Sequence, residues 1–326
     1  MTTSGNYSFT VTGDDLIIEA MMNVGALGEG ATPTAQEFTD CRRKLNMLIK
    51  GLMGSQDRAP GLKMWQRQRG DLFLSSTKGV YSLGPSGDDF AAGVTAGSGN
   101  YLQDTLASPA SGGATTLTPT TIGNFTANDY LVLSLDSGDI YSTVISSVGG
   151  STITVPAIPS SAASGSYLWN YTTKGQRPLE ILTCLLRDIN GNDTPMDRMT
   201  LQDYEALPSK AIPTYLTDPT SFYYQSDLNN GTLYLDLYGA QDVTKHLHLV
   251  YLRPVQDFTN PGDNPEYPQA WFSPLAWGLS KLIAPMFDAE WTQDMEDNRR
   301  ESLMMAQEAD AETTSYYFQA NAEPWR

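Results

Sequence analysis

The sequence predicts an α+β fold, with amphipathic helices at both ends of the chain and antiparallel strands between them. Apolar residues recur at three- and four-residue steps near both ends, which is typical of helices that bury one face. The middle of the chain alternates apolar and polar residues in short runs, and Gly, Asn and Asp separate the runs. With 326 residues, of which 40% are hydrophobic and 17% charged, the chain is long enough to bury a substantial core.

Two helices are predicted in the N-terminal region. The first runs from Asp14 to about Gly25, and Thr12 is its expected cap. The second opens with Thr34-Ala35-Gln36-Glu37, a capping box in which the hydroxyl and the carboxylate satisfy each other's backbone N–H groups. An apolar stripe then continues along this helix and predicts packing on other helices: Phe38, Cys41, Leu45, Leu48, Ile49 and Leu52.

The opposite side of the second helix is basic. Eight of the chain's 20 basic residues lie between Arg42 and Arg69, in a chain whose formal net charge is −17. Such a cluster is usually a solvated helix face or a set of salt-bridge partners for acidic neighbours, and the alternative is a contact with DNA or with an acidic partner. The candidate contact residues are Arg42, Arg43, Lys44, Lys50, Arg67 and Arg69.

Strand patterns begin at Leu72. The runs 72–74 and 80–83 flank Lys78-Gly79, which predicts a hairpin. From Pro85 to Thr173 the chain is rich in Ser, Thr, Gly and Ala and has no Lys or Arg, which indicates an inserted domain. Its runs 130–135, 140–146 and 152–155 predict a β-meander. Later strands end in the alternating run His246 to Tyr251, which is expected to rejoin the hairpin.

Helical periodicity returns after a segment rich in Pro and Gly. It predicts one helix from Trp271 to Ile283 and a second from Trp291 to Ala309. The tail that follows has no amphipathic helical pattern but carries four aromatic residues, and exposed aromatic side chains indicate a partner. These residues are Tyr316, Tyr317, Phe318 and Trp325.

These patterns divide the chain into five parts. Residues 1–71 supply N-terminal helices of a helical bundle, and residues 259–312 supply its C-terminal helices. Residues 72–85 and 175–258 form a central antiparallel β-domain. Residues 86–174 form an inserted small domain, either a β-barrel or a β-sandwich-like fold, and residues 313–326 form an extended tail.

The sequence shows none of the common catalytic motifs, and no enzyme activity is predicted. It contains no G-x-S-x-G elbow, no phosphate-binding loop and no H-E-x-x-H motif. His246 and His248 share one face of a strand and would need a third ligand to bind a metal; we expect them to be solvated instead. The segment Asp188 to Asp193 departs from the calcium-binding pattern and predicts a hairpin turn. No metal or cofactor is predicted, and Cys41 and Cys184 are expected to be buried free thiols.

The order of several short motifs resembles a known family: the head-to-tail adaptor proteins of short-tailed phages, also called packaged-DNA stabilisation or tail tubular protein A-like proteins. The resemblance covers most of the chain, apart from an insert of about 90 residues that the smallest members of the family lack. The matching strings are Ala31-Thr32-Pro33-Thr34-Ala35-Gln36-Glu37, Leu45-Asn46-Met47-Leu48-Ile49-Lys50, Leu62-Lys63-Met64-Trp65, Tyr81-Ser82-Leu83-Gly84-Pro85, Arg177-Pro178-Leu179, Asp193-Thr194-Pro195-Met196, Gly231-Thr232-Leu233-Tyr234-Leu235, Tyr251-Leu252-Arg253-Pro254, Asp257-Phe258 and Asp263-Asn264-Pro265.

The resemblance implies a structural subunit of the virion's head–tail junction, assembled in the host cytoplasm without a membrane. Such subunits form a ring, expected here to be a dodecamer, that sits under the portal protein and extends the DNA channel. The resemblance also implies that the ring binds a tail nozzle or tail tube protein, with tail fibres as a further partner. Genomic DNA is expected to pass through the channel without sequence-specific binding. The four tail aromatics are the expected portal anchors. The acidic C-terminal helix is expected to border the channel, because acidic side chains repel phosphate.

Two other functions remain open from the sequence. The insert rich in Ser, Thr and Gly would suit a tail-fibre or receptor-binding protein. A tail-associated enzyme that degrades polysaccharide would need two carboxylates facing each other across a cleft, and the 37 acidic residues single out no such pair.

Overall fold

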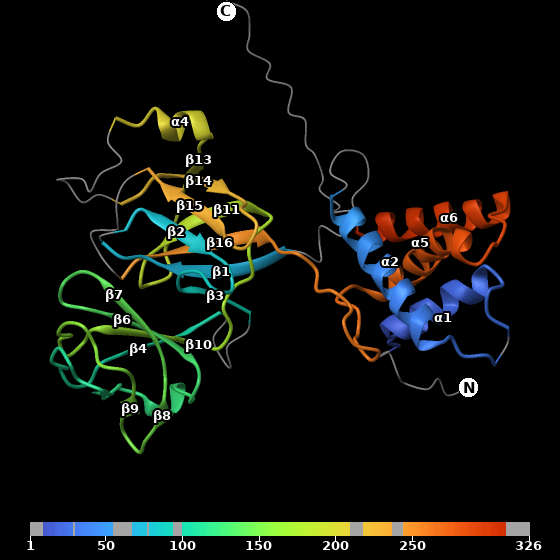
Figure 1. The fold of residues 1–326 in the computed structure, drawn as a ribbon. Coiled ribbons are helices and arrows are strands. Elements are labelled where there is room, and N and C mark those ends of the chain that lie inside the picture. Colours follow the sequence, from blue (N-terminus) through green and yellow to red (C-terminus); the bar gives the residue numbers. More distant parts are fainter. Residues whose placement is uncertain are drawn as a thin grey trace, which may run out of the picture. The chain divides into compact units, whose positions relative to one another are not determined.

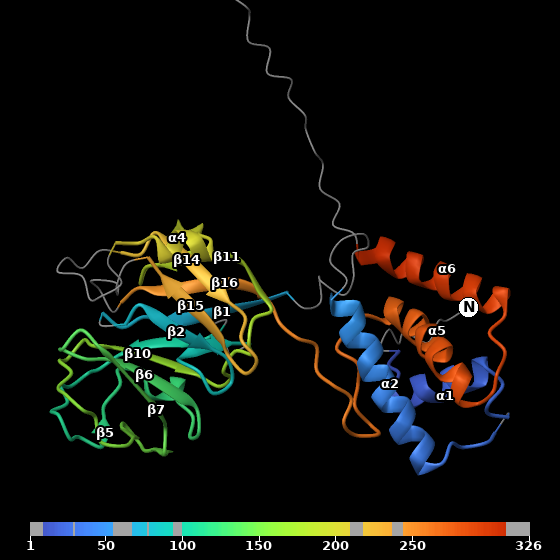
Figure 2. The same cartoon turned by 45° about the horizontal axis from the view of Figure 1, so that its top comes forward.

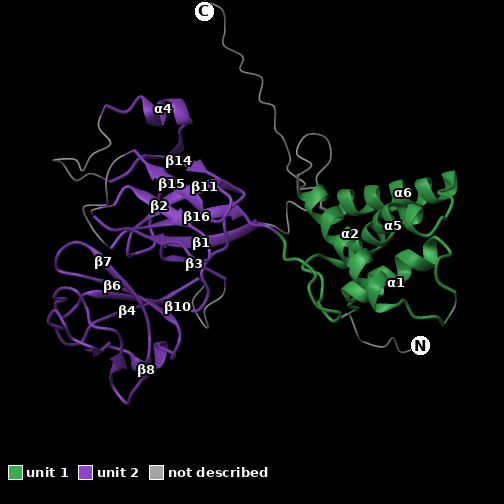
Figure 3. Cartoon of the chain, in the orientation of Figure 1, with its two compact units in different colours: residues 1–65, 255–326 green, residues 66–254 purple. Residues whose placement is uncertain are grey.

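A computed structural model describes residues 9–28, 30–54, 67–76, 78–93, 100–208, 218–236 and 244–310. The chain divides into two compact units, which Figure 3 colours separately. Residues 1–65 and 255–326 belong to the first, which we call the helical unit, and residues 66–254 belong to the second, the β unit. The protein has helices and antiparallel sheets, as the α+β prediction requires.

The helical unit joins helices from both ends of the chain around one core. Helix α5 packs against α1, α2 and α6, and in Figures 1 and 2 it lies between α2 and α6. The core contains Ile17, Leu45, Trp271, Leu279 and Ala306, all fully or almost fully buried. The elements are α1 (Gly13–Asn23), α2 (Ala35–Gly54), the 3-10 turn η2 (Gln269–Trp271), α5 (Phe272–Ile283), the 3-10 turn η3 (Ala284–Met286) and α6 (Gln293–Asp310).

The predicted starts of the two N-terminal helices are confirmed. Thr12 caps α1 and forms a capping box with Asp15, whose carboxylate accepts from the Thr12 backbone N–H at 2.9 Å. Thr34 and Glu37 form the second box, because the Thr34 N–H donates to Glu37 and the Glu37 N–H donates to the Thr34 hydroxyl. The two predicted C-terminal helices are also present as α5 and α6.

The first sheet of the β unit has the strand order β12-β11-β16-β1-β3. Its first and last strands along the chain are neighbours: β1 pairs antiparallel with β16, with Arg67 opposite Leu252. The chain therefore enters and leaves the β unit on adjacent strands. The strands are β1 (Arg67–Phe73), β3 (Phe90–Ala92), β11 (Glu180–Arg187), β12 (Asp193–Pro195) and β16 (His246–Leu252).

The second sheet corrects the predicted hairpin. Strand β2 does not pair with β1; it pairs with β15, opposite Gly231 to Tyr234. The reason is packing: Leu72 and Leu74 from one sheet and Tyr81 and Leu83 from the other are buried in the same core, so the chain crosses between sheets. The order is β13-β14-β15-β2, with β2 (Val80–Leu83), β13 (Asp197–Arg198), β14 (Ser221–Gln225) and β15 (Gly231–Leu235); the short helix α4 (Leu201–Glu205) follows β13.

The insert has its own core, built around Leu131, Leu133, Ile153 and Leu168. Strands β6 and β7 form the predicted hairpin, but the third predicted strand of the meander joins a separate small sheet as β9. The described residues form no closed barrel. The larger sheet has the order β4-β10-β6-β7 and consists of β4 (Leu102–Thr105), β6 (Tyr130–Ser134), β7 (Ile140–Val144) and β10 (Tyr167–Tyr171). The smaller sheet has the order β5-β9-β8 and consists of β5 (Thr116–Leu117), β8 (Ser147–Val148) and β9 (Ile153–Thr154). The 3-10 turn η1 (Ile122–Asn124) precedes β6.

Candidate functional site: the basic face of helix α2

Helix α2 buries its apolar face and presents a basic one. Cys41, Leu45 and Ile49 are fully or almost fully buried in the helical core. Arg43 and Lys50 are exposed on another face, and Met47 between them is 64% exposed. These three residues follow a spacing of four and then three positions, which places them on one side of the helix. We call Arg43, Met47 and Lys50 the α2 stripe.

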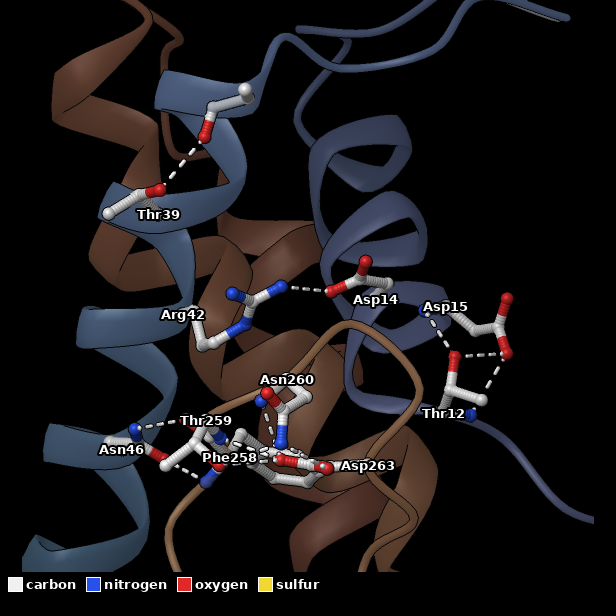
Figure 4. Close-up of polar contacts among 11 residues, drawn as sticks. Thr12, Asp14, Asp15, Thr39, Arg42, Asn46, Phe258, Thr259, Asn260 and Asp263 are labelled. Carbon is white, nitrogen blue, oxygen red and sulfur yellow. Dashed lines mark hydrogen bonds and ion pairs between the residues drawn. The ribbon is translucent and has the colours of Figure 1, made fainter.

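A segment from the C-terminal half of the chain docks beside this stripe. The Asn46 side-chain amide donates to the Phe258 carbonyl at 3.0 Å, and the Phe258 N–H donates back to the Asn46 side-chain oxygen at 3.0 Å (Figure 4). The Lys50 ammonium donates to the Val255 carbonyl at 2.8 Å. Because Phe258 and Val255 are also buried in the helical core, the segment is held by polar and apolar contacts together.

Asp263 fixes the turn that follows. Its carboxylate accepts from the backbone N–H groups of Thr259 and Asn260, both at 2.7 Å (Figure 4). These backbone hydrogen bonds lower the pKa of Asp263 to about 2, because they stabilise the charged form. The Asp263 carbonyl accepts from the Gly13 N–H at 3.0 Å, which ties the turn to the start of α1.

The helix and the docked segment enclose an open groove of about 640 Å³. Three residues of the segment, 257–259, form one wall. The other wall is α2, which contributes basic side chains, the exposed thioether of a methionine and two uncharged polar side chains. That wall consists of Thr39, Arg42, Arg43, Asn46, Met47 and Lys50.

Three of the predicted basic residues form ion pairs within the helical unit. Arg42 contacts Asp14 at 2.7 Å, in a pair that is largely buried (Figure 4). Arg43 contacts Asp40 at 3.2 Å, and Lys50 contacts Asp257 at 2.7 Å. The last two pairs are exposed, Arg43 by 70%, and exposed pairs contribute little to stability. Arg42 is therefore part of the α1–α2 contact, whereas Arg43 and Lys50 keep charge at the surface.

The structure does not bring all six predicted basic residues together in one unit. Lys44, like Arg43 and Lys50, lies on α2 in the helical unit. Arg67 and Arg69 lie on β1 and belong to the β unit. The four predicted tail aromatics, Tyr316, Tyr317, Phe318 and Trp325, lie outside the described residues.

The expectation that the two histidines are solvated is wrong. His246 and His248 are 1% and 8% exposed, and both face the buried Asp71 on the neighbouring strand. His248 hydrogen-bonds the Asp71 carboxylate at 2.7 Å, and Asn100 donates to its other oxygen at 2.6 Å. Burial alone would raise the pKa of Asp71, but the hydrogen bonds from His246 and His248 outweigh it and lower this pKa.

The two histidines belong to a buried hydrogen-bond network around Asp71. The hydroxyl of Tyr101 lies 3.0 Å from His246 Nε2, so the ring contacts both Tyr101 and Asp71. Within the described part of the chain, no three His, Cys, Asp or Glu side chains are arranged to hold a metal ion. The two described thiols, Cys41 and Cys184, are buried and free, as predicted, and burial raises the pKa of both.

A second hollow lies in the β unit. It has a volume of about 620 Å³ and is lined by Asp88, Asp89, Asp139 and several serines. Each of the three carboxylates has a partner within the β unit. Asp88 forms an ion pair with Lys78, and Asp89 accepts hydrogen bonds from Ser142 and Tyr171. Asp139 accepts a hydrogen bond from Ser75 at 2.7 Å. Burial raises the pKa of Asp89, and the bonds from Ser142 and Tyr171 oppose that effect.

Sequence reasoning missed the role of Asn46 and the cleft carboxylates. A polar Asn between the apolar positions of an amphipathic helix was a usable signal, because such a residue needs a partner when it is part-buried. Its partner lies 212 positions later, and no local pattern indicates it. Asp139 comes from a segment 50 positions after the adjacent Asp88 and Asp89, so only the fold brings it beside them.

No family model matches the chain, and no curated protein matches it. No described helix has the length and the apolar character needed to span a bilayer.

Proposed function

We propose that the protein is a structural head-to-tail adaptor subunit of a tailed phage, which forms a ring under the portal, extends the DNA channel and docks the tail. One observation carries the proposal: helices from the two ends of the chain share one core, and the β unit is inserted between them on adjacent strands. This arrangement suits a ring in which the helices surround a channel and the β units project from it.

The positions of the resembling motifs support the same proposal. The strings 31–37 and 45–50 supply the capping box and part of α2, and Asp257-Phe258 and Asp263 supply the segment that docks on α2. These strings therefore meet in the helical unit, although they are distant in the sequence; the other strings that the structure describes belong to the β unit. Motifs that meet at one structural contact are stronger support than the same strings taken one by one.

The charge of α6 fits a helix that borders a DNA channel. Its N-terminal half carries exposed Asp294 and Asp297, and Glu296 in the same half is surrounded by basic side chains. Hydrogen bonds from Arg299 and Lys281 lower the pKa of Glu296, so the carboxylate stays charged. A carboxylate-rich wall repels DNA phosphates and lets the duplex slide.

The test is electron microscopy of the purified protein, alone and mixed with the portal protein of the same phage. We expect a ring that caps the portal. Removing residues 313–326 is expected to abolish capping, and a variant with Tyr316→Ser, Tyr317→Ser and Phe318→Ser keeps the tail's length while removing three anchors. A chain that never contacts the portal, with or without its tail, contradicts the proposal.

The cleft of the β unit favours a second candidate, a receptor-binding protein of the tail. Carboxylates and hydroxyls around a 620 Å³ hollow can accept and donate hydrogen bonds to the hydroxyls of a saccharide. Binding of host polysaccharide that is lost in an Asp139→Asn variant, without any contact with the portal, would select this function. Release of sugar by the wild type and not by this variant would select the polysaccharide-degrading enzyme.

A further inference from the structure

The exposed face of α6 carries a pattern that matches the α2 stripe with the opposite charge. Glu301 and Glu308 are exposed, and Met304 and Met305 between them are 59% and 61% exposed. We call these four residues the α6 stripe. Glu301, Met305 and Glu308 follow the same spacing of four and then three positions as Arg43, Met47 and Lys50. Both stripes therefore extend over about 10 Å of helix, with a methionine near the middle.

The two stripes fit each other in both relative directions. With the helices parallel, Arg43 meets Glu301, Met47 meets Met305 and Lys50 meets Glu308. With the helices antiparallel, Arg43 meets Glu308 and Lys50 meets Glu301, while Met47 meets Met304. In both cases two ion pairs flank a contact between flexible thioether side chains, which adapt well to a partner surface.

The charges on both stripes are available for this contact. No ion pair involves Glu301 or Glu308 among the described residues. Arg43 pairs with Asp40 and Lys50 pairs with Asp257, and both pairs are open enough to solvent to be weak. The Lys50 ammonium has three donors, of which two face the Val255 carbonyl and Asp257, so the third can donate to a second carboxylate.

The stripes are not paired within one chain. Helix α5 packs against both α2 and α6 and lies between them (Figure 2), and among the described residues no ion pair joins Arg43 or Lys50 to Glu301 or Glu308. A contact between them therefore joins two copies, and each copy keeps one free α2 stripe and one free α6 stripe. Such a head-to-tail contact repeats until it closes into a ring or extends as a filament.

We propose that the α2 groove binds the α6 stripe of a second copy of this chain, and that this contact sets the register between neighbouring subunits. The inference rests on the proposed function, because it names the partner of the α2 groove in the ring. A separate acidic protein would also suit Arg43 and Lys50, but the matched spacing of charge and methionine within the same chain favours the second copy.

Charge reversal tests the pairing in the full-length protein. One variant carries Arg43→Glu and Lys50→Glu, and the other carries Glu301→Lys and Glu308→Lys. Each variant alone places like charges opposite each other, so we expect its self-association in sedimentation velocity to be about tenfold weaker or more. Mixing the two variants creates attractive pairs at every contact, and we expect assembly to return with the two proteins alternating.

A matched control changes the net charge by the same amount elsewhere. The variant with Arg198→Glu, Gln103→Glu and Thr116→Glu lowers the net charge by the same four units at exposed positions of the β unit, and it is expected to assemble like the wild type. Circular dichroism of each variant checks that the fold is kept. Cross-linking between one protein with Met47→Cys and another with Met304→Cys or Met305→Cys gives an independent measure, because the native thiols are buried.

The outcomes separate this inference from the proposed function. If the wild type is monomeric by itself, the same variants are compared by the completeness of the ring on the portal protein. If the protein forms rings that depend on both stripes but do not bind the portal protein, the inference stands and the adaptor proposal is overturned. If both reversed variants form rings on the portal protein as well as the wild type does, the adaptor proposal stands and the inference is overturned. Failure of the mixed variants to regain assembly also overturns it.

Discussion

The side-chain amide of Asn46 forms two hydrogen bonds with the backbone of Phe258, one donated and one accepted, both 3.0 Å long. This contact joins α2 to a segment 212 positions later, and both residues line the groove beside the α2 stripe. It also satisfies both backbone polar groups of Phe258 at a place without regular secondary structure. The stability of the helical unit therefore depends on a residue outside its apolar core.

Replacing Asn46 with Ala is expected to destabilise the helical unit by about 1–3 kcal/mol, because two part-buried backbone groups lose their partner. Urea unfolding followed by circular dichroism measures the change. The neighbouring Met47→Ala is the control and is expected to cost less than about 0.5 kcal/mol, since this side chain is 64% exposed. Equal costs for the two variants would contradict the structural role of Asn46.

Two glycines of the helical unit are expected to respond in opposite ways to alanine. A Cβ at Gly13 would lie 2.6 Å from the ring of Phe258, so Gly13→Ala is expected to displace that ring and cost about 1–3 kcal/mol. A Cβ at Gly51 in α2 meets nothing within 4 Å, so Gly51→Ala is expected to stabilise by about 0.5–1 kcal/mol. Thermal unfolding of both variants provides the comparison, and a destabilising Gly51→Ala would contradict it.

Asp263 is expected to stabilise the helical unit in a pH-dependent manner. Backbone hydrogen bonds lower its pKa from the ordinary value of 3.8 to about 2 in the folded protein. The stabilisation is therefore complete above about pH 4 and is lost as the pH falls toward 2. The Tm difference between the wild type and Asp263→Asn should be largest near neutral pH and should shrink across this window. A difference that stays constant down to pH 2 would argue against this carboxylate as the cause.

Asp71 is expected to be the most sensitive polar position of the β unit. Asp71→Ala removes the buried acceptor that His248 and Asn100 share, and breaking a buried network of this kind costs about 3 kcal/mol or more. Asp71→Asn keeps one acceptor and should cost less. The exposed Asp197→Ala serves as the control and should be nearly neutral. Hydrogen exchange of β1 and β16 would report the loss, and unchanged protection of these strands in Asp71→Ala would contradict it.

The sequence by itself determined the helices and the general class of the fold. Capping boxes at Thr12 and Thr34 and apolar steps of three and four residues act within one or two turns, so they can be recognised without the rest of the chain. The alternation from His246 to Tyr251 was equally local, and it is present as β16 beside β1. The Asn190-Gly191 turn joins β11 and β12 for the same reason, with Gly191 at a φ of 84°.

Only the tertiary structure decided which of these elements meet. Strand β2 pairs with β15 rather than β1, because Tyr81 and Leu83 are buried by packing across two sheets. His246 and His248 are buried because Asp71 faces them from a strand about 175 positions earlier. The pairing of Asn46 with Phe258 has the same origin. A single sequence records local preference, but contacts between distant segments depend on the burial and hydrogen bonding of the whole fold.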